Sequence, residues 1–408
     1  MGGRSHFRRI SMTALPAVRI DEHSVRRLKQ GYPWVFRSEV INAKESEAIK
    51  SGQVVDFVRD KGDFVGRGFY NPKPQLVGRI MTLKPEENIE RFFIYHKVES
   101  AIVYRDRIFG APFYRLIHAE SDGLPGLIVD RFGDVLVAQI NTAGMEALWP
   151  HVESALKSLI KPKEIVLKND TPARELEGLE QKVSVISGAL PDPVIKITEG
   201  NVQFHVNVVE GQKTGWFYDQ RDNRTWVAQL AKGGSLADIF CHTGGFGITA
   251  AVNGAENVTF IDSSSEALMM LDKNAALNGI EKKCQTIEGQ AFEMMDKLAR
   301  MGRRYDVVCV DPPAFVKSRK DLGPGMKGYQ KLARLSAELV ERSGFLFFAS
   351  CSSHVGTKDL IEVVAGGLSK SGRPFQLIKT AGAGPDHPVH PMLPETSYLK
   401  ALTFRFLD

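Results

Sequence analysis

The chain has 408 residues, of which 43% are hydrophobic and 25% are charged, and its formal net charge is +5. This length exceeds one typical domain, so we expect two or three domains with packed cores. No run of about eighteen apolar residues occurs, which argues against a membrane span. The cysteines are Cys241, Cys284, Cys309 and Cys351. None forms a C-x-x-C pair with another, so the sequence predicts no metal site, and reduced thiols in the cytoplasm are expected.

The N-terminal region carries the basic excess of the chain. Residues 1–100 contain 18 Lys and Arg against 12 Asp and Glu. A basic module suits a polyanionic partner, although ordinary mixed surface charge is the competing interpretation. Residues 1–15, rich in Arg and Ser, are interpreted as a basic tail in preference to a transit peptide.

The region before residue 195 predicts two domains of different composition. Residues 16–87 alternate apolar and polar side chains, which predicts a small β-rich domain, and residues 88–194 mix helical and strand patterns, which predicts an α+β domain. The expected strands of the first domain are 53–58, 64–70 and 75–81, with a break at 71–74 and a linker at 84–88. The second is expected to contain a helix within 89–109, two strands within 127–140, a helix at 147–160, a strand at 164–168 and a boundary at 190–193.

Residues 195–408 alternate strand and helix patterns. The expected strands are 195–198, 202–208, one that begins at 235, then 257–261, 284–287, 305–310 and 345–350. The expected helices are one that ends at 253, then 266–277, one that ends at 300, and 329–342. Such alternation predicts an α/β, Rossmann-like domain with a mainly parallel, doubly wound sheet, whose ligands bind at the carboxyl ends of the strands.

Two motifs at those strand ends favour a nucleotide-like ligand. Residues 238–247, with the sequence DIFCHTGGFG, lie between an expected strand and an expected helix, and Asp262 ends the next strand. Glycines let the backbone approach a ligand, and an acidic residue at that position can accept hydrogen bonds from ribose hydroxyls. The spacing is not G-x-G-x-x-G, which disfavours a nicotinamide dinucleotide. The structural alternatives are a packing glycine pair and a helix cap within 262–266.

Two further motifs indicate chemistry on a base. Residues 311–315, with the sequence DPPAF, follow an apolar strand, and their prolines stiffen a loop that could hold the polar edge of a flipped base. Residues 349–353, with the sequence ASCSS, place Cys351 at the end of the following strand, where a nucleophile could meet that base. The structural alternatives are a simple turn and a buried cysteine.

Taken together, T-G-G-F at 243–246, D-P-P-x-F at 311–315 and S-C-S at 350–352 resemble the bacterial large-subunit ribosomal RNA cytosine-5 methyltransferases. The segments 215–224, 122–131 and 32–36 are similar to further signatures of that family, so the resemblance spans nearly the whole chain. It implies a PUA domain at 16–87, a central α+β domain at 88–194 and a methyltransferase domain at 195–408. It also implies S-adenosylmethionine as cofactor and large-subunit ribosomal RNA as partner. The oligomeric state stays open, and apolar surface in the central domain could support a homodimer.

The resemblance carries specific residues as well. The implied cofactor-binding residues are Gln220, Arg221, Asp238, Phe240, Thr243, Gly244, Gly245, Asp262, Ser263, Gln290, Ala291, Phe292 and Asp311, and the implied substrate-binding residues are Pro312, Pro313 and Phe315. Gln290 stands where the family usually has Asp, and Cys241-His242 stands where Ser-Tyr is usual, so the adenine contact is expected to be adjusted. Cys241 is expected under the cofactor and is not the expected nucleophile.

The implied mechanism uses Cys351 and Asp311 as catalytic residues. The Cys351 thiolate would add to carbon 6 of cytosine, and Asp311 would engage ring nitrogen 3 and the amino group. No residue is assigned as the base that removes the carbon 5 proton. Two alternatives remain open: an amino-group methyltransferase acting on adenine or guanine, which uses D-P-P without a thiol, and a non-catalytic RNA-binding or ribosome-assembly factor.

Overall fold

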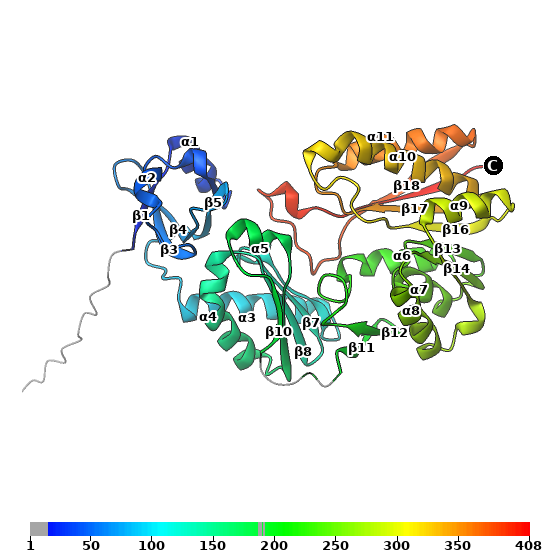
Figure 1. Ribbon diagram of the computed structural model, residues 1–408, viewed down its shortest axis with the longest axis horizontal. Coiled ribbons are helices and arrows are strands. Elements are labelled where there is room, and N and C mark those ends of the chain that lie inside the picture. The colour runs from blue at the N-terminus through cyan, green and yellow to red at the C-terminus, as the bar shows by residue number, and fades with distance from the viewer. Residues whose placement is uncertain (1–14, 187–189, 191) are drawn as a thin grey trace, which may run out of the picture.

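The structure of the protein is a computed structural model that describes residues 15–186, 190 and 192–408. The predicted basic tail, except Leu15, lies outside the described residues, as does Pro191 of the predicted boundary. Three bodies follow one another along the chain in Figure 1: a blue N-terminal one, a cyan-to-green central one and a green-to-red C-terminal one. Among the residues that the structure describes, no helix is long and apolar enough to cross a membrane.

The N-terminal body is built on a five-stranded sheet with the order β1-β3-β4-β5-β2. Its elements are β1 (Ala17–Arg19), α1 (Glu22–Lys29), β2 (Trp34–Phe36), α2 (Ala43–Ser46), β3 (Gln53–Val58), β4 (Phe64–Tyr70) and β5 (Leu76–Thr82). The three strands expected from alternation are therefore confirmed to within one residue. The alternation pattern does not predict α1, which begins after the N-cap residue Asp21. Asp21 Oδ1 accepts a hydrogen bond from Ser24 N at 2.7 Å.

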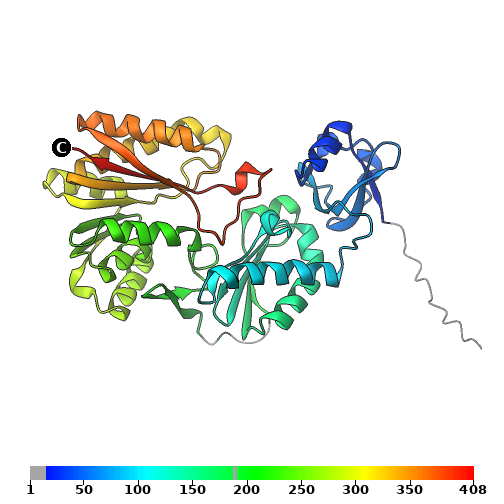
Figure 2. The same cartoon turned by 180° about the vertical axis from the view of Figure 1, so that it is seen from behind.

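The central body is built on a five-stranded sheet with the order β10-β9-β8-β7-β6, and Figure 2 shows α3 crossing one of its faces. Its elements are α3 (Arg91–Ile108), β6 (Phe113–His118), β7 (Leu127–Phe132), β8 (Val135–Ile140), α4 (Ala143–Leu159), β9 (Glu164–Asn169), α5 (Pro172–Glu177) and β10 (Lys182–Val185). The helix α4 begins four residues before the prediction because Thr142 caps it, with Oγ1 accepting a hydrogen bond from Met145 N at 3.3 Å.

An antiparallel hairpin leads into the C-terminal body. It consists of β11 (Val194–Glu199) and β12 (Val202–Asn207), which match the expected strand pair. The hairpin is docked on a helix of the C-terminal body, α8 (Ser265–Leu277), and the amide oxygen of Asn274 accepts a hydrogen bond from His205 N at 2.6 Å.

The C-terminal body contains a seven-stranded sheet with the order β15-β14-β13-β16-β17-β19-β18. Its strands are β13 (Ser235–Ile239), β14 (Asn257–Asp262), β15 (Cys284–Glu288), β16 (Tyr305–Val310), β17 (Val340–Ser350), β18 (Phe375–Ala381) and β19 (Lys400–Phe406). Its other helices are α6 (Arg221–Leu230), α7 (Gly245–Val252), α9 (Ala291–Arg300), α10 (Leu322–Leu339) and α11 (Thr357–Leu368). The first five strands in this order, β15, β14, β13, β16 and β17, pair in parallel. The strand β19 is antiparallel to both of its neighbours, β17 and β18.

Helices cover both faces of this sheet. One buried core lies under α6, α7 and α8 and another under α9, α10 and α11, which Figure 1 shows on opposite sides of the strands. The predicted α/β, doubly wound fold is confirmed. The strand order reverses between β13 and β16, so the loops after these two strands lie at the switch point where ligands bind in such folds.

One predicted helix of this body was wrong at both ends. The structure has α10 over 322–339 instead of 329–342. Pro324 and the nearby glycines have low helix propensity, so the sequence pattern does not predict the start of the helix. Proline is nevertheless tolerated in the first turn, because its missing N–H needs no partner there. The chain turns to extended backbone at Val340, where β17 begins in register with β16.

Candidate active site

The loop after β13 has an unusual backbone. Phe240, His242 and Gly244 have φ angles of 63°, 50° and 86°, and two of these residues are not glycine. A Cβ on Gly244 would lie 2.8 Å from Ile248 Cδ1, so glycine is required there by both conformation and space. The loop is held by hydrogen bonds from Gly244 N to Cys241 O at 2.8 Å and from Cys241 N to Ile261 O at 3.1 Å. Backbone strain held in this way is typical of functional loops.

Asp238 lies below this loop with 1% of its surface exposed. Its Oδ2 accepts a hydrogen bond from Gly247 N at 2.9 Å, while Oδ1 has no partner among the residues that the structure describes. Burial raises the pKa of Asp238 to about 7, and the carboxylates of Asp311 and Asp262 add to that effect. A buried carboxylate oxygen without a partner is costly, and it suits a cationic ligand group such as the ammonium of S-adenosylmethionine.

Asp262 ties the loops after β13 and β14 together. Its Oδ2 accepts a hydrogen bond from His242 N at 2.8 Å, and its Oδ1 accepts one from Ser264 N at 3.0 Å. Ser264, and not Asp262, caps α8, because its Oγ accepts from Ala267 N at 3.2 Å. The helix-cap alternative for Asp262 is therefore excluded. Each carboxylate oxygen retains capacity to accept another hydrogen bond, as a ribose diol would require.

The three residues expected beside adenine stand at the start of α9. Gln290 is the N-cap residue, is exposed, and its side chain forms no capping hydrogen bond within the described chain. Ala291 is buried, and the half-buried ring of Phe292 stacks on Phe315 with centroids 6.2 Å apart. An expected adenine neighbour and an expected substrate neighbour therefore lie side by side.

Asp311 follows β16 and is linked to the segment before α6. Its Oδ2 accepts a hydrogen bond from Gln220 Nε2 at 2.9 Å, and Asn223 orients this amide by donating to Gln220 Oε1 at 2.6 Å. Burial raises the pKa of Asp311 to about 7, and the neighbouring carboxylate of Asp219 raises it further against the opposing charge of Lys213. Asp311 can therefore exist as an acid near neutral pH.

Cys351 follows β17 between two serines that are both bound to Tyr329 of α10. Ser350 Oγ donates to Tyr329 Oη at 2.8 Å, and Ser352 Oγ lies 2.7 Å from the same oxygen. Ser352 Oγ also accepts a hydrogen bond from Val316 N at 3.2 Å, which joins this turn to the D-P-P loop. Burial raises the pKa of the half-buried Cys351 thiol, and the electrostatic effect of Asp311 adds to it. The charge of one predicted catalytic residue, Asp311, therefore acts on the thiol of the other, Cys351.

The remaining cysteines differ from Cys351. Cys241 is 5% exposed and Cys309 is fully buried, and burial raises the pKa of both thiols well above the ordinary value. Cys284 is half-buried at the start of β15, at the far edge of the sheet. A reactive thiol needs access to its partner, and Cys351 is the cysteine that combines partial exposure with a place beside the D-P-P loop.

Asp219 and Tyr398, for which the sequence motifs predict no role, complete the site. Asp219, directly before Gln220, is 5% exposed, and its Oδ2 accepts a hydrogen bond from Tyr398 Oη at 2.5 Å. Its Oδ1 has no partner within the described ranges. Although burial raises the pKa of Asp219, the charge of Lys213 and other groups lower it to about 2. Asp219 lies within the segment 215–224 that carried the family resemblance, and that signal could have singled it out.

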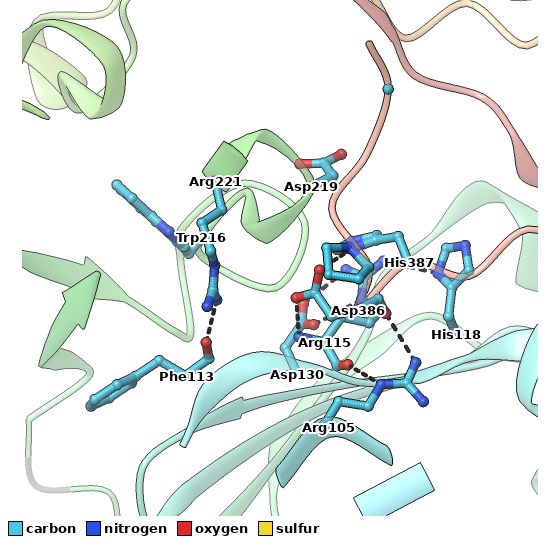
Figure 3. Close-up of polar contacts among 12 residues, drawn as sticks. Arg105, Phe113, Arg115, His118, Asp130, Trp216, Asp219, Arg221, Asp386 and His387 are labelled. Carbon is cyan, nitrogen blue, oxygen red and sulfur yellow. Dashed lines mark hydrogen bonds and ion pairs between the residues drawn. The ribbon is translucent and has the colours of Figure 1, made fainter. Parts of the chain in front are cut away.

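We call Gln220, Asp238, Asp262, Asp311 and Cys351 the strand-end cluster. A second group, shown in Figure 3, joins the central body to the C-terminal body, and we call it the interdomain cluster. It consists of Arg105, Arg115, Asp130, Asp386 and His387.

The interdomain cluster anchors two segments of the C-terminal body. Arg115 donates to both oxygens of Asp130 at 2.7 and 2.8 Å, and Asp130 also accepts from Thr214 Oγ1 at 2.5 Å. Asp386 accepts from Arg115 N at 2.9 Å through Oδ2. Thr214 lies shortly before Asp219 in the chain, and Asp386 lies shortly before Tyr398. The central body therefore supports both segments that are joined by the hydrogen bond between Tyr398 and Asp219.

Arg221 is directed at the central body. Its guanidinium donates to Phe113 O, as Figure 3 shows, and lies 4.5 Å from the centroid of the Phe109 ring. Its expected role in enclosing the cofactor stays a prediction. Phe240 and Thr243 stand in the loop after β13, and Gly245 is the first residue of α7. Ser263 is exposed after β14, and in the D-P-P loop Pro312 is buried and Pro313 is exposed.

Comparison with known protein families defines the class. A PUA-like domain matches residues 18–83, and the S-adenosylmethionine-dependent methyltransferase family matches residues 181–405. The protein is therefore an S-adenosylmethionine-dependent methyltransferase with a PUA-like domain, which confirms the predicted cofactor.

Similar proteins narrow the family. Ribosomal RNA large subunit methyltransferase I from Klebsiella pneumoniae (strain 342) is 33% identical over 386 residues, covering 94% of this chain and 96% of that protein. The protein of the same name from Escherichia coli O139:H28 (strain E24377A / ETEC) is 32% identical over 387 residues, covering 94% and 97%. The chain belongs to the family of these proteins, which confirms the resemblance found from its motifs.

A solved structure supports the fold across the whole chain. SMU.776, a candidate methyltransferase crystallised with SAH, superposes with a TM-score of 0.82 and covers 96% of this chain and 100% of its own. Its sequence identity is 18%, so the likeness concerns the fold alone.

Proposed function

We propose that this methyltransferase forms 5-methylcytosine in large-subunit ribosomal RNA through a covalent bond between Cys351 and the base. The observation that carries the proposal is the placement of Asp311 and Cys351 at the ends of the neighbouring strands β16 and β17, where the charge of Asp311 raises the pKa of the Cys351 thiol in addition to burial. The names of the relatives support ribosomal RNA of the large subunit as the substrate class. Such a substrate places the activity in the cytoplasm.

The cofactor would be held by the loops at the strand ends. Asp238 would receive the ammonium of the methionine part, since its Oδ1 lacks a partner in the described structure. Asp262 would accept the ribose hydroxyls. The other contacts would come from Gln220, Arg221, Phe240, Thr243, Gly244, Gly245, Ser263, Gln290, Ala291, Phe292 and Asp311. When bound, the cofactor supplies the electrophilic methyl group that an activated carbon 5 accepts.

The residues of the chain activate that carbon. The Cys351 thiolate adds to carbon 6, forming a C–S bond and moving the electrons of the 5,6 double bond toward carbon 5. Asp311, whose pKa is raised to about 7, donates its proton toward ring nitrogen 3 and so stabilises the adduct. Pro312, Pro313 and Phe315 would hold the base in reach. Loss of the carbon 5 proton to a base then restores the 5,6 double bond and expels the Cys351 thiolate, and ring nitrogen 3 returns its proton to Asp311.

RNA binding and assembly extend the proposal to the other bodies. We infer a PUA domain at 16–87, a central domain at 88–194 and a methyltransferase domain at 195–408, with the first contacting the RNA backbone and an unpaired or flipped base reaching the third. A homodimer would use α3, where Phe92 and Val103 are 78% and 62% exposed. Light scattering of the purified chain, compared with a Phe92→Glu variant, tests this last point.

The decisive test compares the wild type with Cys351→Ala on ribosomal RNA from cells that lack this protein. We expect the variant to lose methylation entirely while it still binds S-adenosylmethionine in calorimetry. RNA that contains 5-fluorocytosine should form a covalent complex with the wild type and none with the variant, because fluorine at carbon 5 blocks release of the thiolate. Mapping 5-methylcytosine with and without the protein identifies the nucleotide.

Three outcomes distinguish the alternatives. Full turnover by Cys351→Ala would exclude the cytosine mechanism and favour an amino-group methyltransferase. Absence of S-adenosylmethionine binding by the wild type would favour an RNA-binding or assembly factor. Loss of both binding and turnover in the variant alone would show that Cys351 is needed for the fold, in which case Cys351→Ser is the variant to measure.

A further inference from the structure

Asp219, in the 3₁₀ helix Tyr218–Gln220, has one bonded and one unbonded carboxylate oxygen, although only 5% of its surface is exposed. Oδ2 accepts a hydrogen bond from Tyr398 Oη at 2.5 Å, and the backbone carbonyl of Asp219 accepts one from Gly384 N at 3.2 Å. Oδ1 has no partner within the part of the chain that the structure describes. A buried carboxylate oxygen without a donor is costly, so Oδ1 indicates a ligand that brings a donor.

We propose that Asp219 Oδ1 accepts a hydrogen bond from the exocyclic amino group of the target cytosine, so that Asp219 selects cytosine over uracil. This proposal rests on the cytosine chemistry proposed above. It concerns recognition of the base alone, and no proton or covalent bond is transferred to Asp219.

The residue after Asp219 connects it to the D-P-P loop. Gln220 Nε2 donates to Asp311 Oδ2 at 2.9 Å, so the backbone of Asp219 lies within the reach of one side chain from Asp311. The electrostatics agree with this placement, because the charge of Asp219 adds to burial in raising the pKa of Asp311. A base bound by Asp311 therefore lies close to Asp219.

The residue that binds Asp219 connects it to the Cys351 turn, in which Cys351 lies between two serines. Lys400, the first residue of β19, donates from its ammonium to Tyr398 O at 2.8 Å and to Ser352 O at 2.6 Å. Tyr398 is thereby fixed beside the Cys351 turn, and its hydroxyl fixes Asp219. Asp219 is thus joined by contacts to both of the loops that would hold the base.

The hydrogen bonds of Asp311 show why the base needs a second carboxyl group. Asp311 Oδ2 accepts from Gln220, so Oδ1 is the oxygen left to donate a proton to ring nitrogen 3. The amino group beside ring nitrogen 3 is itself a donor and requires an acceptor of its own. Asp219 Oδ1 is a buried acceptor without a donor among the described residues.

The charge states of the two carboxyl groups match the edge of cytosine. Burial raises the pKa of Asp311 to about 7, so it can exist as an acid. Burial also raises the pKa of Asp219, but the charges of Lys213 and His387 and the hydrogen bond from Tyr398 lower it to about 2. Asp219 is therefore an acceptor only, which suits an amino group and opposes the carbonyl oxygen that uracil has at the same position.

The test compares synthetic RNAs that differ at one base. They carry cytosine, uracil or pyrimidin-2-one, which lacks the amino group, at the nucleotide that mapping of 5-methylcytosine identifies. Fluorescence anisotropy measures their affinities in the presence of S-adenosylhomocysteine and in a Cys351→Ser background, which excludes the covalent bond to the base. Because a hydrogen bond to a charged group changes an equilibrium constant about 10- to 100-fold, we expect the pyrimidin-2-one RNA to bind that much more weakly than the cytosine RNA and the uracil RNA at least as weakly.

Asp219→Asn is the decisive variant, because its amide oxygen can still accept from Tyr398 while its amide nitrogen can donate toward the base. We expect its affinity for the cytosine RNA to fall about 10- to 100-fold, its affinity for the pyrimidin-2-one RNA to change little, and the uracil RNA to gain relative to the cytosine RNA. Asp219→Ser also removes the charged acceptor and covers the case in which Asp219→Asn does not fold.

Thr214→Val is the matched control. It removes the hydrogen bond from Thr214 Oγ1 to Asp130 and so loosens the same segment without changing the acceptor. We expect it to leave the ratios of affinity among the three RNAs unchanged. Calorimetry with S-adenosylhomocysteine shows for each variant that the methyltransferase domain is folded.

Equal affinities of the Cys351→Ser protein for the three RNAs would overturn the proposal, as would an unchanged preference for cytosine in folded Asp219→Asn. A loss of the same factor for all three RNAs would assign Asp219 a structural role and also overturn it. If no 5-methylcytosine depends on this protein, the proposed function fails and this proposal fails with it. If that modification is found and Asp219→Asn still prefers cytosine, only the role of Asp219 fails.

Discussion

In the interdomain cluster, Arg115 donates hydrogen bonds to both carboxylate oxygens of Asp130. Burial raises the pKa of Asp386, but the hydrogen bond and the charge of His387 and other groups outweigh burial, so this pKa is lowered. In the strand-end cluster, Asp238 keeps an oxygen without a partner in the described residues, and the pKa values of Asp238 and Asp311 are both raised to about 7. Buried charges that are fully paired hold the bodies together. Buried carboxylates left incompletely paired are poised for a ligand or a proton.

The comparison of the two clusters predicts the largest loss of activity for a substitution of Asp311. Asp311→Asn keeps an oxygen for Gln220 but removes the proton that the adduct needs, so we expect kcat to fall by about 10²–10⁴-fold. Methylation rates at saturating RNA measure this loss. Binding of S-adenosylmethionine within a few-fold of the wild type serves as the control, and a kcat close to that of the wild type would contradict the assigned role.

The pH dependence of the same variant gives an independent readout. Above pH 7 the wild type loses the acid form of Asp311 while it gains Cys351 thiolate, so its rate should level off. Asp311→Asn cannot titrate, and its residual rate should keep rising with pH. Parallel profiles for the two proteins would show that Asp311 does not act as the acid.

A substitution in the interdomain cluster should lower the free energy of unfolding and should not remove a group that takes part in the chemistry. Arg115→Met leaves Asp130 charged and buried without its bidentate partner, which costs about 3–5 kcal/mol. Urea unfolding measures the free energy. Lys163→Met, which breaks the exposed pair with Asp134, should leave the unfolding curve in place. Equal curves for Arg115→Met and the wild type would remove the distinction between the clusters.

In the absence of cofactor, a substitution of Asp238 should stabilise the protein, whereas Arg115→Met destabilises it. Its folded pKa of about 7 exceeds the unfolded value, so the stability it contributes is present below pH 4 and is lost as the pH rises through 7. Asp238→Asn does not ionise and should be more stable than the wild type at pH 8, by at most about 4 kcal/mol. Thermal melts at pH 5 and pH 8 check that the gap widens with pH, while calorimetry should show weaker cofactor binding.

The smallest effect is expected for the hydrogen bond between Tyr398 and Asp219, which lies between the interdomain cluster and the strand-end cluster. Tyr398→Phe removes a hydrogen bond to Asp219 and should cost about 1–3 kcal/mol of stability, because Asp219 remains buried with one partner fewer. Urea unfolding again measures it. Tyr104→Phe removes the hydrogen bond to Pro385 O at an exposed position and should change stability less than Tyr398→Phe does.

Prediction from sequence succeeded for the family and the cofactor, which short segments of the chain indicate. The turns at 243–246, 311–315 and 350–352 each follow a buried strand, and parallel topology brings their ends together whatever the rest of the chain does. Prediction was weaker where a helix start is concealed by proline and glycine, as in α10. It also missed Tyr329, whose hydroxyl is hydrogen-bonded to the serines on both sides of Cys351 although it lies far from them in the sequence.

The sequence by itself determined the class of the fold through its periodicity, which is a local property. Its strand-end motifs, through their family resemblance, indicated the cofactor and the two residues expected to perform the chemistry. Only the tertiary structure decided which buried charges are paired. Arg115 and Lys400 look alike in sequence, as single cations in or beside apolar strands. Folding brings Asp130 to the first and the Cys351 turn to the second, since long-range pairing across a sheet and between domains selects partners that no local pattern can specify.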